Sequence, residues 1–393
     1  MPVIEMVFWF FIFLVVYCYA GYGAFLFVFN SIKQKLNSQK KESIITDWPS
    51  VTFIIPVFDE EDIIEQKIEN TLSLNYPANK LNVIFITDGS RDGSVDVIKN
   101  YPDTLLLHMP ERRGKSAAIK RAMRYVKTQF VVFSDANAIL NSDALQLLMK
   151  HFADSKVGGV AGEKKVMNKK LFAAGMAEGI YWRYESFLKK QDAAFYSVVG
   201  AAGELFAIRT HLFKSFDDSI ILDDFMISVQ VCLQGYRFAY EPGAYAIETP
   251  SVSLGDEKLR KVRIAAGAYQ TISQLPGCFN MFKYPLLCFQ YFSRRLLRWT
   301  VCPLLFVLIF FINVYLLRIN ASAVYFYLML GQIVFYIAAF FGWLTVKINR
   351  NPGWLTIPFY FVFMNMCLYR GFFNFISNKH TVLWKKSLRE AFQ

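Results

Sequence analysis

Charged residues are scarce in this chain. They make up 19% of the 393 residues, whereas an average soluble domain carries about 25%. Hydrophobic residues make up 54%, the mean hydropathy is +0.29, and 39 Phe and 21 Tyr exceed what one soluble core needs. This composition excludes a disordered chain, a collagen-like fibre and a coiled coil. It indicates a membrane protein that also carries a water-soluble part.

Histidine and cysteine are also few. The four histidines are scattered along the chain and give little support to a histidine-based metal site. None of the six cysteines forms a CxxC pair, and most lie in apolar stretches. We therefore expect buried, reduced thiols rather than a disulfide framework.

The positive charge has no pattern typical of nucleic-acid binding. The chain has 43 Lys and Arg against 31 Asp and Glu, which gives a net charge of +12. Such a balance suits nucleic acid, anionic lipid or phosphate-bearing substrates. Because no basic stripe with interleaved aromatic residues occurs, we expect no nucleic-acid partner.

The first long run without charge is Met6–Phe29. It is long enough to cross a hydrocarbon core, which takes about 20 helical residues. No basic segment precedes it and no clear cleavage site follows, so we expect an uncleaved anchor rather than a signal peptide. Lys33, Lys35, Lys40 and Lys41 follow the run, and the positive-inside rule places that side in the cytoplasm.

Three further uncharged runs lie near the other end: Trp299–Leu317, Ile319–Val346 and Asn351–Tyr369. Before them, Pro285–Arg298 mixes bulky apolar side chains with three arginines. That mixture is typical of a helix lying among lipid headgroups, and the alternative is a cytoplasmic turn next to the membrane.

The topology stays open. If residues 31–284 are cytoplasmic, three further crossings put the C-terminus outside. The tail, however, carries Lys379, Lys385, Lys386 and Arg389, which favour the inside. Either the last run is re-entrant or interfacial, or the positive-inside rule fails here.

The middle of the chain alternates short apolar runs, such as the predicted strands Val51–Val57 and Thr104–Leu107, with segments of helical periodicity. This order predicts a mainly parallel sheet covered on both faces, in which ligands bind beyond the carboxyl ends of the strands. Polar clusters follow three predicted strands at those ends: Asp59-Glu60-Glu61, Asp88-Gly89-Ser90 and Asp135-Ala136-Asn137. The sequence therefore predicts a polar pocket along one edge of a nucleotide-binding type of sheet.

The residue types at this edge suit a nucleotide and a metal ion. Asp88 can accept hydrogen bonds from a nucleobase or ribose, and Asp135 with Asn137 offers oxygen ligands to Mg²⁺ or Mn²⁺. Gly114 and Lys115 open a predicted helix, whose N-terminus together with the lysine attracts phosphate.

Six segments, in order along the chain, resemble motifs of the family 2 glycosyltransferases, the inverting GT-A group. They are Ile55–Glu61, Thr87–Ser94, Arg113–Ala118, Ser134–Asn137, Leu222–Phe225 and Arg260–Arg263. The resemblance covers about residues 50 to 270, and the flanking membrane segments fit the membrane-bound members such as the synthases of exopolysaccharide, hyaluronan and poly-N-acetylglucosamine.

The resemblance implies roles for individual residues. Asp224 is expected to be the catalytic base, oriented by Asp223. Donor binding is expected from Pro56, Asp59, Glu61, Asp88, Gly114, Lys115, Asp135, Arg260 and Arg263. Mg²⁺ or Mn²⁺ binding is expected from Asp135 and Asn137. Apart from the resemblance, acceptor binding is expected from Trp182, whose ring can stack on a sugar, and from Gly200 and Gly203, where a sugar can approach the backbone closely.

Two positions depart from the family pattern. Asn137 replaces the second acidic residue of the Asp-x-Asp motif, so Asp135 carries more of the expected metal binding. Ile264 stands where polymerising members have the Trp that stacks on the acceptor sugar. Trp182 can supply a replacement surface, or it only packs its helix onto the sheet or the membrane. Likewise, Asp223 and Asp224 can instead cap the helix that follows them.

The expected architecture is α/β, with a GT-A nucleotide-sugar-binding domain flanked by transmembrane helices. Its four parts are an N-terminal transmembrane helix (1–30), a basic linker (31–48), a cytoplasmic catalytic domain (49–275), and an interfacial helix with C-terminal transmembrane helices (276–393).

The expected activity is transfer of a sugar from a nucleotide sugar, a UDP-sugar in the first instance, to a growing polysaccharide at the bacterial inner membrane. An accessory export subunit is a possible partner. The alternative is a single addition to a lipid-linked acceptor. A transporter with a cytoplasmic regulatory domain is disfavoured, because so few spans leave little to build a pathway.

Overall fold

The computed structural model describes residues 2–36, 47–167, 173–249, 251, 253–320, 322–348, 350–379 and 381–383. Within the predicted basic linker, Lys40 and Lys41 lie outside the described residues. So do Lys385, Lys386 and Arg389 of the tail.

The centre of the molecule is an eight-stranded sheet with the order β3-β2-β1-β4-β7-β6-β8-β5. The neighbours β3, β2, β1 and β4 run parallel, as do β6 and β8, whereas the pairings β4–β7, β7–β6 and β8–β5 are antiparallel. The predicted α/β fold with a mainly parallel sheet is therefore confirmed. The strands are β1 Val51–Val57, β2 Leu81–Thr87, β3 Thr104–Leu107, β4 Phe130–Phe133, β5 Ile139–Leu140, β6 Val157–Val166, β7 Phe206–Arg209 and β8 Arg237–Glu248.

Both faces of this sheet are buried. All seven residues of β1 are buried, as expected for a strand of a parallel sheet with helices on either side. Because successive side chains point to opposite faces, Ile54 joins one hydrophobic core while Phe53 and Ile55 join the other. The first core also takes residues of α5 (Lys115–Met123) and α8 (Asp223–Cys232), and the second takes residues of α3 (Glu61–Leu72), α4 (Ser94–Lys99) and α6 (Ala144–Lys150).

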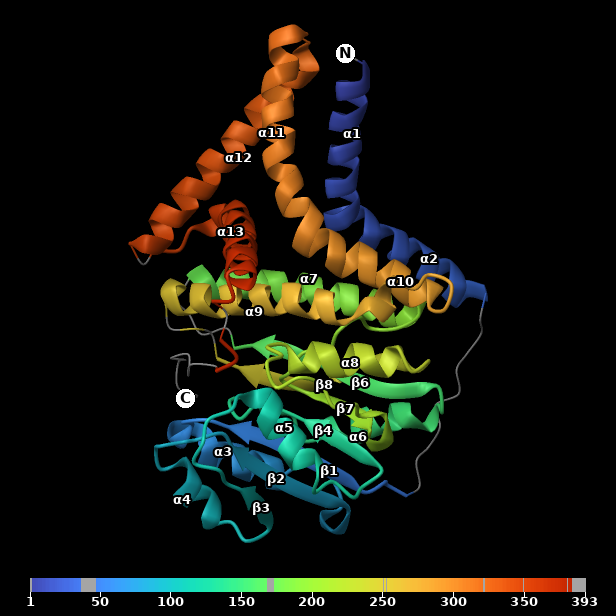
Figure 1. Cartoon of the computed structure of the whole chain (residues 1–393), viewed down its shortest axis with the longest axis vertical. Helices are drawn as coiled ribbons and strands as arrows, with labels where there is room; N and C mark the ends of the chain where they lie inside the picture. The colour runs from blue at the N-terminus through green and yellow to red at the C-terminus, as the bar shows by residue number, and fades with distance from the viewer. Residues whose placement is uncertain are drawn as a thin grey trace.

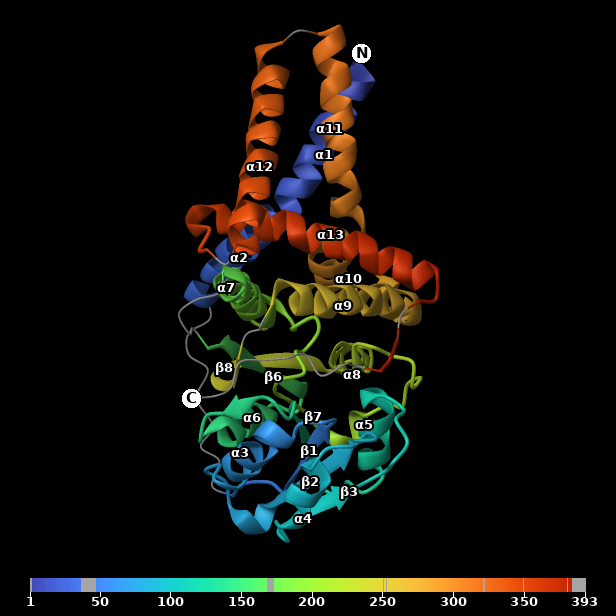
Figure 2. The ribbon, with the colours of Figure 1, turned by 90° about the vertical axis from the view of Figure 1, so that its left-hand side faces the viewer.

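A layer of helices separates the sheet domain from the apolar helices above it (Figure 1). Helices α7 (Ala173–Phe195) and α9 (Leu254–Gln274) lie side by side across the domain, and α13 (Thr356–Ile376) crosses above α9 (Figure 2). The packing of α13 on α9 is close, because a Cβ added at Gly371 would lie 2.4 Å from the Cβ of Ala265. The run Asn351–Tyr369 thus lies largely in a helix that rests on α9.

Three helical segments among the described residues are long and apolar enough to span a membrane: Pro2–Leu36, Pro285–Ile319 and Ala323–Lys347. The first comprises α1 (Pro2–Val16), the π-helical turn η1 (Tyr17–Gly21) and α2 (Tyr22–Leu36). The second comprises α10 (Pro285–Tyr291), the π-helical segment η6 (Phe292–Val301) and α11 (Cys302–Ile319), and the third is α12. Both 35-residue segments change direction near their π-helical parts, so that α2 and α10 run along the domain (Figure 1).

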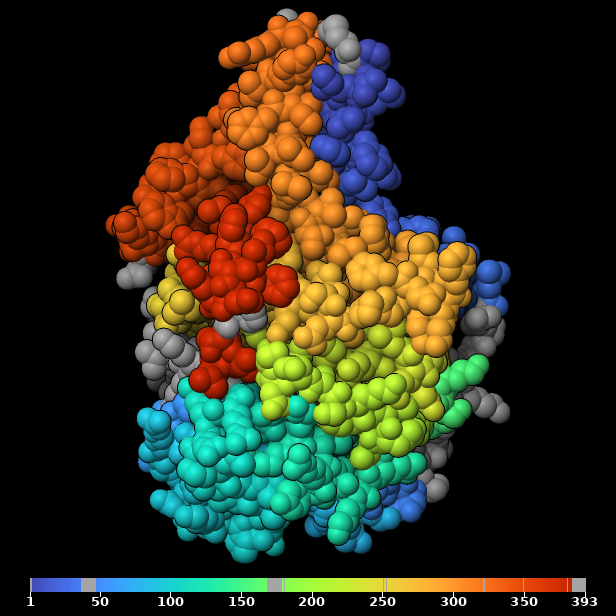
Figure 3. Space-filling model, viewed as in Figure 1, coloured from blue at the N-terminus to red at the C-terminus, as the bar shows by residue number. Residues whose placement is uncertain are grey.

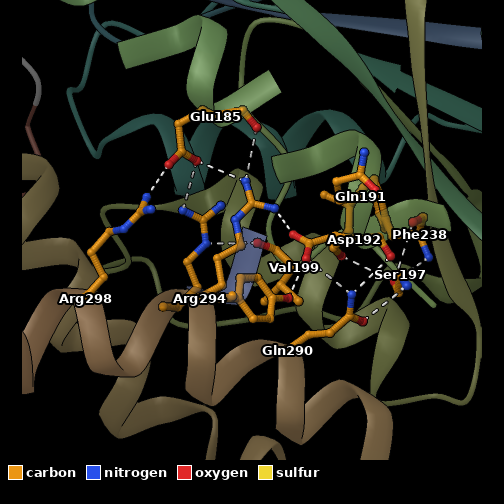
Figure 4. Close-up of polar contacts among 12 residues, drawn as sticks. Glu185, Gln191, Asp192, Ser197, Val199, Phe238, Gln290, Arg294 and Arg298 are labelled. Carbon is orange, nitrogen blue, oxygen red and sulfur yellow. Dashed lines mark hydrogen bonds and ion pairs between the residues drawn. The ribbon is translucent and has the colours of Figure 1, made fainter. Parts of the chain in front are cut away.

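The arginines of Pro285–Arg298 do not face outward as a headgroup-binding helix would require. Arg294 is fully buried and forms ion pairs with Glu185 and Asp192 of α7. Arg298 also pairs with Glu185, and Figure 4 shows these side chains pointing from η6 toward α7. Removing these charges from water is unfavourable, and the ion pairs offset that cost because each arginine has a carboxylate partner.

The chain returns to the sheet domain after α13. A Cβ added at Gly114, just before α5, would lie 2.7 Å from Cγ1 of Val382. Figure 3 shows C-terminal residues, in red, on the surface between α13 and the domain.

Candidate active site

The two predicted catalytic aspartates are the first two residues of α8. Asp223 is buried, Asp224 is half-buried, and both line a cavity of about 930 Å³. The N-terminus of a helix favours carboxylates, and Oδ1 of Asp224 accepts a hydrogen bond of 2.7 Å from the amide of Phe225. Burial, and next the charge of Asp223, raise the pKa of Asp224 to about 7. Asp224 can therefore accept a proton near neutral pH.

Lys115 connects these aspartates to Asp135. Its ammonium lies 2.7 Å from Oδ1 of Asp135 and 3.5 Å from Oδ2 of Asp223. Burial would lower the pKa of Lys115, but the carboxylates of Asp135, Asp223 and Asp224 raise it above its usual range. Lys115 therefore stays charged at neutral pH, at the start of α5 and beside the end of β4.

Gly203 lies among the charged groups of Lys115, Asp135 and Asp224. An added Cβ would lie 3.1 Å from Nζ of Lys115 and 3.4 Å from an oxygen of both Asp135 and Asp224. Gly200 has a different reason to be glycine: its φ is +91°, and a Cβ would meet the ring of Phe225 at 2.2 Å. The space at Gly203 thus belongs to the charged cluster, whereas Gly200 is required by packing.

Helix α9 adds arginines to the same cavity. Arg260 is paired with Glu257 at 3.0 Å, and Arg263 lines the cavity beside it. The pKa of Arg263 is lowered by burial against the opposing charges of Asp223 and Asp135. Within the described structure Nε of Arg263 has no hydrogen-bond partner, so this guanidinium has donors free for a ligand.

Three predicted donor-binding carboxylates do not line this cavity. Asp88 accepts hydrogen bonds of 2.8 Å from the amides of Arg113 and Gly114, and so shapes the turn before α5. Asp59 accepts from the amide of Arg91 at 2.8 Å, and Glu61 from that of Gly93 at 2.9 Å.

Asp59 and Glu61 line a second pocket of about 370 Å³ instead. Pro56, by contrast, lines the large cavity. The expected meeting of acidic residues therefore holds only in part. Asp135, Asp223 and Asp224 line the large cavity with Lys115 and Arg263, whereas Asp88 does not.

The residues expected to hold a metal ion lie together. Asp135 and Asn137 both line the cavity, close to the buried Oδ2 of Asp223, which has no hydrogen-bond partner among the described residues. The described part of the chain contains no cluster of three His, Cys, Asp or Glu side chains suited to a metal. The donors fit a cation such as Mg²⁺ or Mn²⁺ that takes its remaining ligands from water and substrate phosphates.

The cavity also extends from the aspartates to the helices that lie above the sheet domain. Its further walls come from α7, α9, η6 and α13, and include Trp182, Tyr360 and Arg298. Ile264 also lines it, at the position where a Trp is expected in polymerising members. Trp182, which is predicted to bind the acceptor, lies in this wall together with Lys164 and Lys189, which the sequence did not single out.

Lys164 is the centre of a charged group that sequence reasoning did not find. It is buried in β6, its ammonium lies 2.5 Å from both Glu204 and Glu248, and it lies 4.9 Å from the ring centre of Trp182. The sequence offered one indication of this group, because Glu204 directly follows the predicted site residue Gly203. Pairing Lys164 with Glu204 and Glu248 required the sheet register.

Residues 52–216 match the sequence model of the glycosyl transferase family 2. The matched segment, less than half of the chain, is similar to this family. The chain is also similar to the poly-beta-1,6-N-acetyl-D-glucosamine synthase of Staphylococcus aureus (strain MSSA476), with 26% identity over 310 residues, 75% of this chain and 73% of the relative. The enzyme of that name from Staphylococcus epidermidis is 23% identical over 233 residues, 56% of this chain and 55% of the relative.

A solved structure is similar to this chain in fold. It is a mannosyltransferase from Pyrobaculum calidifontis in complex with GDP-Man and Mn²⁺, with a TM-score of 0.65 and 19% identity. The match covers 93% of this chain and 99% of the mannosyltransferase. The expected GT-A fold is thereby confirmed.

Proposed function

We propose that this glycosyltransferase transfers N-acetylglucosamine from its UDP-linked donor to a growing polysaccharide, with inversion at the anomeric carbon. The observation that carries the proposal is the cavity itself. Asp135, Asp223, Asp224, Lys115 and Arg263 meet at one end of it, and the other end reaches the helices next to the membrane. The choice of sugar rests on the staphylococcal relatives.

In the proposed reaction Asp224 removes the proton of the acceptor hydroxyl. Proton transfer to a positioned base is typically worth about 10²–10⁴ in rate. The hydroxyl oxygen then forms the new glycosidic bond as the bond to the diphosphate breaks on the opposite face, which inverts the configuration. Asp223 holds Lys115 beside Asp224.

The leaving diphosphate gains negative charge as its bond breaks. Lys115 and Arg263, both within the cavity, are positioned to stabilise that charge. A divalent cation bound by Asp135 and Asn137 would supply further neutralisation of the same phosphates.

The apolar helices support a multi-pass topology. With the catalytic domain in the cytoplasm, α1 spans outward to the N-terminus, and α11 and α12 form one outward and one inward crossing. Because α13 rests on α9, the chain that follows α13 stays on the cytoplasmic side in this topology, as the basic residues of the tail sequence favour. We propose the bacterial inner membrane as the location.

Product sizing tests the proposal. Purified full-length protein in lipid vesicles with radiolabelled UDP-N-acetylglucosamine and Mn²⁺ should yield a long polysaccharide, and Asp224→Asn should yield none above background. A product with one sugar on a lipid would overturn the polymerase in favour of a single-addition enzyme. Failure to consume this donor, with consumption of another nucleotide sugar, would overturn the choice of sugar.

A further inference from the structure

Lys189 is a buried lysine on α7 for which the reaction has no use so far. Its side chain lines the cavity, and the residue is 2% exposed. The ammonium lies 5.4 Å from the ring centre of Trp182 and 5.9 Å from that of Tyr240. In the described structure it makes no hydrogen bond.

The missing hydrogen bonds are costly for a buried ammonium. A charge taken out of water destabilises the fold unless it is paired or hydrogen-bonded. The neighbouring Lys164 meets that requirement, with Glu204 and Glu248 each at 2.5 Å. Among the described residues Lys189 has ring contacts with Trp182 and Tyr240 but no hydrogen bond, so up to three N–H donors remain for a ligand.

The position of Lys189 is fixed by the helix that carries it. Trp182 and Lys189 are seven residues apart and share one stripe of α7, while Glu185 and Asp192 form the adjoining stripe. Arg294 pairs with both carboxylates and so ties this stripe of α7 to η6 (Figure 4). The ammonium therefore stays in the cavity wall.

The charges around Lys189 favour a neutral ligand. Burial lowers the pKa of Lys189, the opposite charges of Glu163, Glu204 and Glu185 counteract that shift, and the like charge of Arg294 adds to it. An added anion would meet the repulsion of those carboxylates. A neutral sugar, in contrast, offers hydroxyl and acetamide oxygens that accept hydrogen bonds from an ammonium.

We propose that Lys189 donates hydrogen bonds to a neutral oxygen of the acceptor sugar bound beside Trp182. Lys189 is then a specificity-determining residue of the acceptor subsite, at the membrane side of Asp224. The inference rests on the proposed glycosyl transfer, and it adds the group that recognises the acceptor.

Lys189→Met tests the subsite, with Lys190→Met as the matched control. Lys190 is the next residue of α7 and is exposed. The assay uses full-length protein in lipid, UDP-N-acetylglucosamine as the donor and an N-acetylglucosamine oligosaccharide as the acceptor. A hydrogen bond from a charged donor is worth enough that the acceptor KM should rise about 10- to 100-fold, and the donor KM far less. Lys189→Gln, which keeps two N–H donors, should recover part of the loss.

The melting temperature separates recognition from a structural role. Removing an ammonium without hydrogen bonds should leave the melting temperature of Lys189→Met equal to or above that of the wild type. An unchanged acceptor KM, or a lower melting temperature with both KM values affected alike, would overturn the inference. If wild-type protein consumes no donor, the proposed function fails instead. The melting temperature of Lys189→Met then still decides whether the ammonium has a structural role. A lower melting temperature than that of the wild type would overturn the proposed acceptor subsite.

Discussion

Gly203→Ala gives the sharpest test of the charged cluster, because it adds one methyl group at its centre. The new Cβ would lie 3.1 Å from Nζ of Lys115 and 3.4 Å from oxygens of Asp135 and Asp224. Ordinary contacts between heavy atoms are about 3.5–4.0 Å, so the lysine must move by several tenths of an ångström. A misplacement of about 1 Å at a reacting centre costs about 10²-fold in rate. We expect kcat/KM to fall about 10- to 100-fold, which corresponds to roughly 1.4–2.8 kcal/mol.

Stability should change in the opposite direction. Gly203 does not have a left-handed backbone conformation, so alanine fits there and reduces the entropy of the unfolded chain, a gain of about 0.4–1 kcal/mol. The assay is release of UDP from purified protein in lipid, alongside a melting curve. Gly255→Ala is the control, because Gly255 is exposed on α9 and its added Cβ would touch only Ser253 Oγ, at 3.5 Å. Wild-type turnover in a folded Gly203→Ala protein would refute the assignment of these three groups to the reaction.

Three further outcomes follow from the geometry. Asp224 must be deprotonated to act as a base, so turnover should fall about tenfold per pH unit below its pKa of about 7, and a flat profile down to about pH 5 would contradict this role. Removal of divalent cations with EDTA should abolish sugar transfer, and added Mn²⁺ should restore it. Asp135→Ala should show no restoration at the same Mn²⁺ concentration. Turnover that persists in EDTA would argue against a metal ion. Glu185→Ala leaves the arginines of η6 without their main partner. Loss of one member of a buried pair lowers the free energy of unfolding by about 3–5 kcal/mol, so the unfolding midpoint in detergent should fall. Lys190→Ala is the control and should keep a higher midpoint than Glu185→Ala. An unchanged midpoint for Glu185→Ala would show that these pairs contribute little.

Local sequence patterns predicted most of the fold because their causes are local. The strand boundaries Val51–Val57 and Thr104–Leu107 agree with the structure, since each is a short apolar run bounded by polar residues or turns. Uncharged runs likewise predicted the segments able to span a membrane. The polar residues after β1, β2 and β4 were expected at one edge, and for Asp135 that expectation is met within the large cavity.

Tertiary structure alone decided which of those polar residues meet. Asp59, Glu61 and Asp88 have the residue types of ligand-binding groups, yet their oxygens accept hydrogen bonds from backbone amides of neighbouring turns. Sequence cannot distinguish the two uses, because a carboxylate at the end of a strand serves both equally well.

Long-range pairing fixed the remaining features. The arginines of η6 looked like a lipid-facing set, but Glu185 lies 109 residues before Arg294 and neutralises it in the interior. In the same way α13 is apolar enough in sequence to suggest a crossing, and its contact with α9 was visible only in the fold. The amino-acid sequence by itself determined which segments are apolar, which are strands and where acidic residues follow them. Packing determined which charges face one another, because a buried charge is stable only where the rest of the chain brings it a partner.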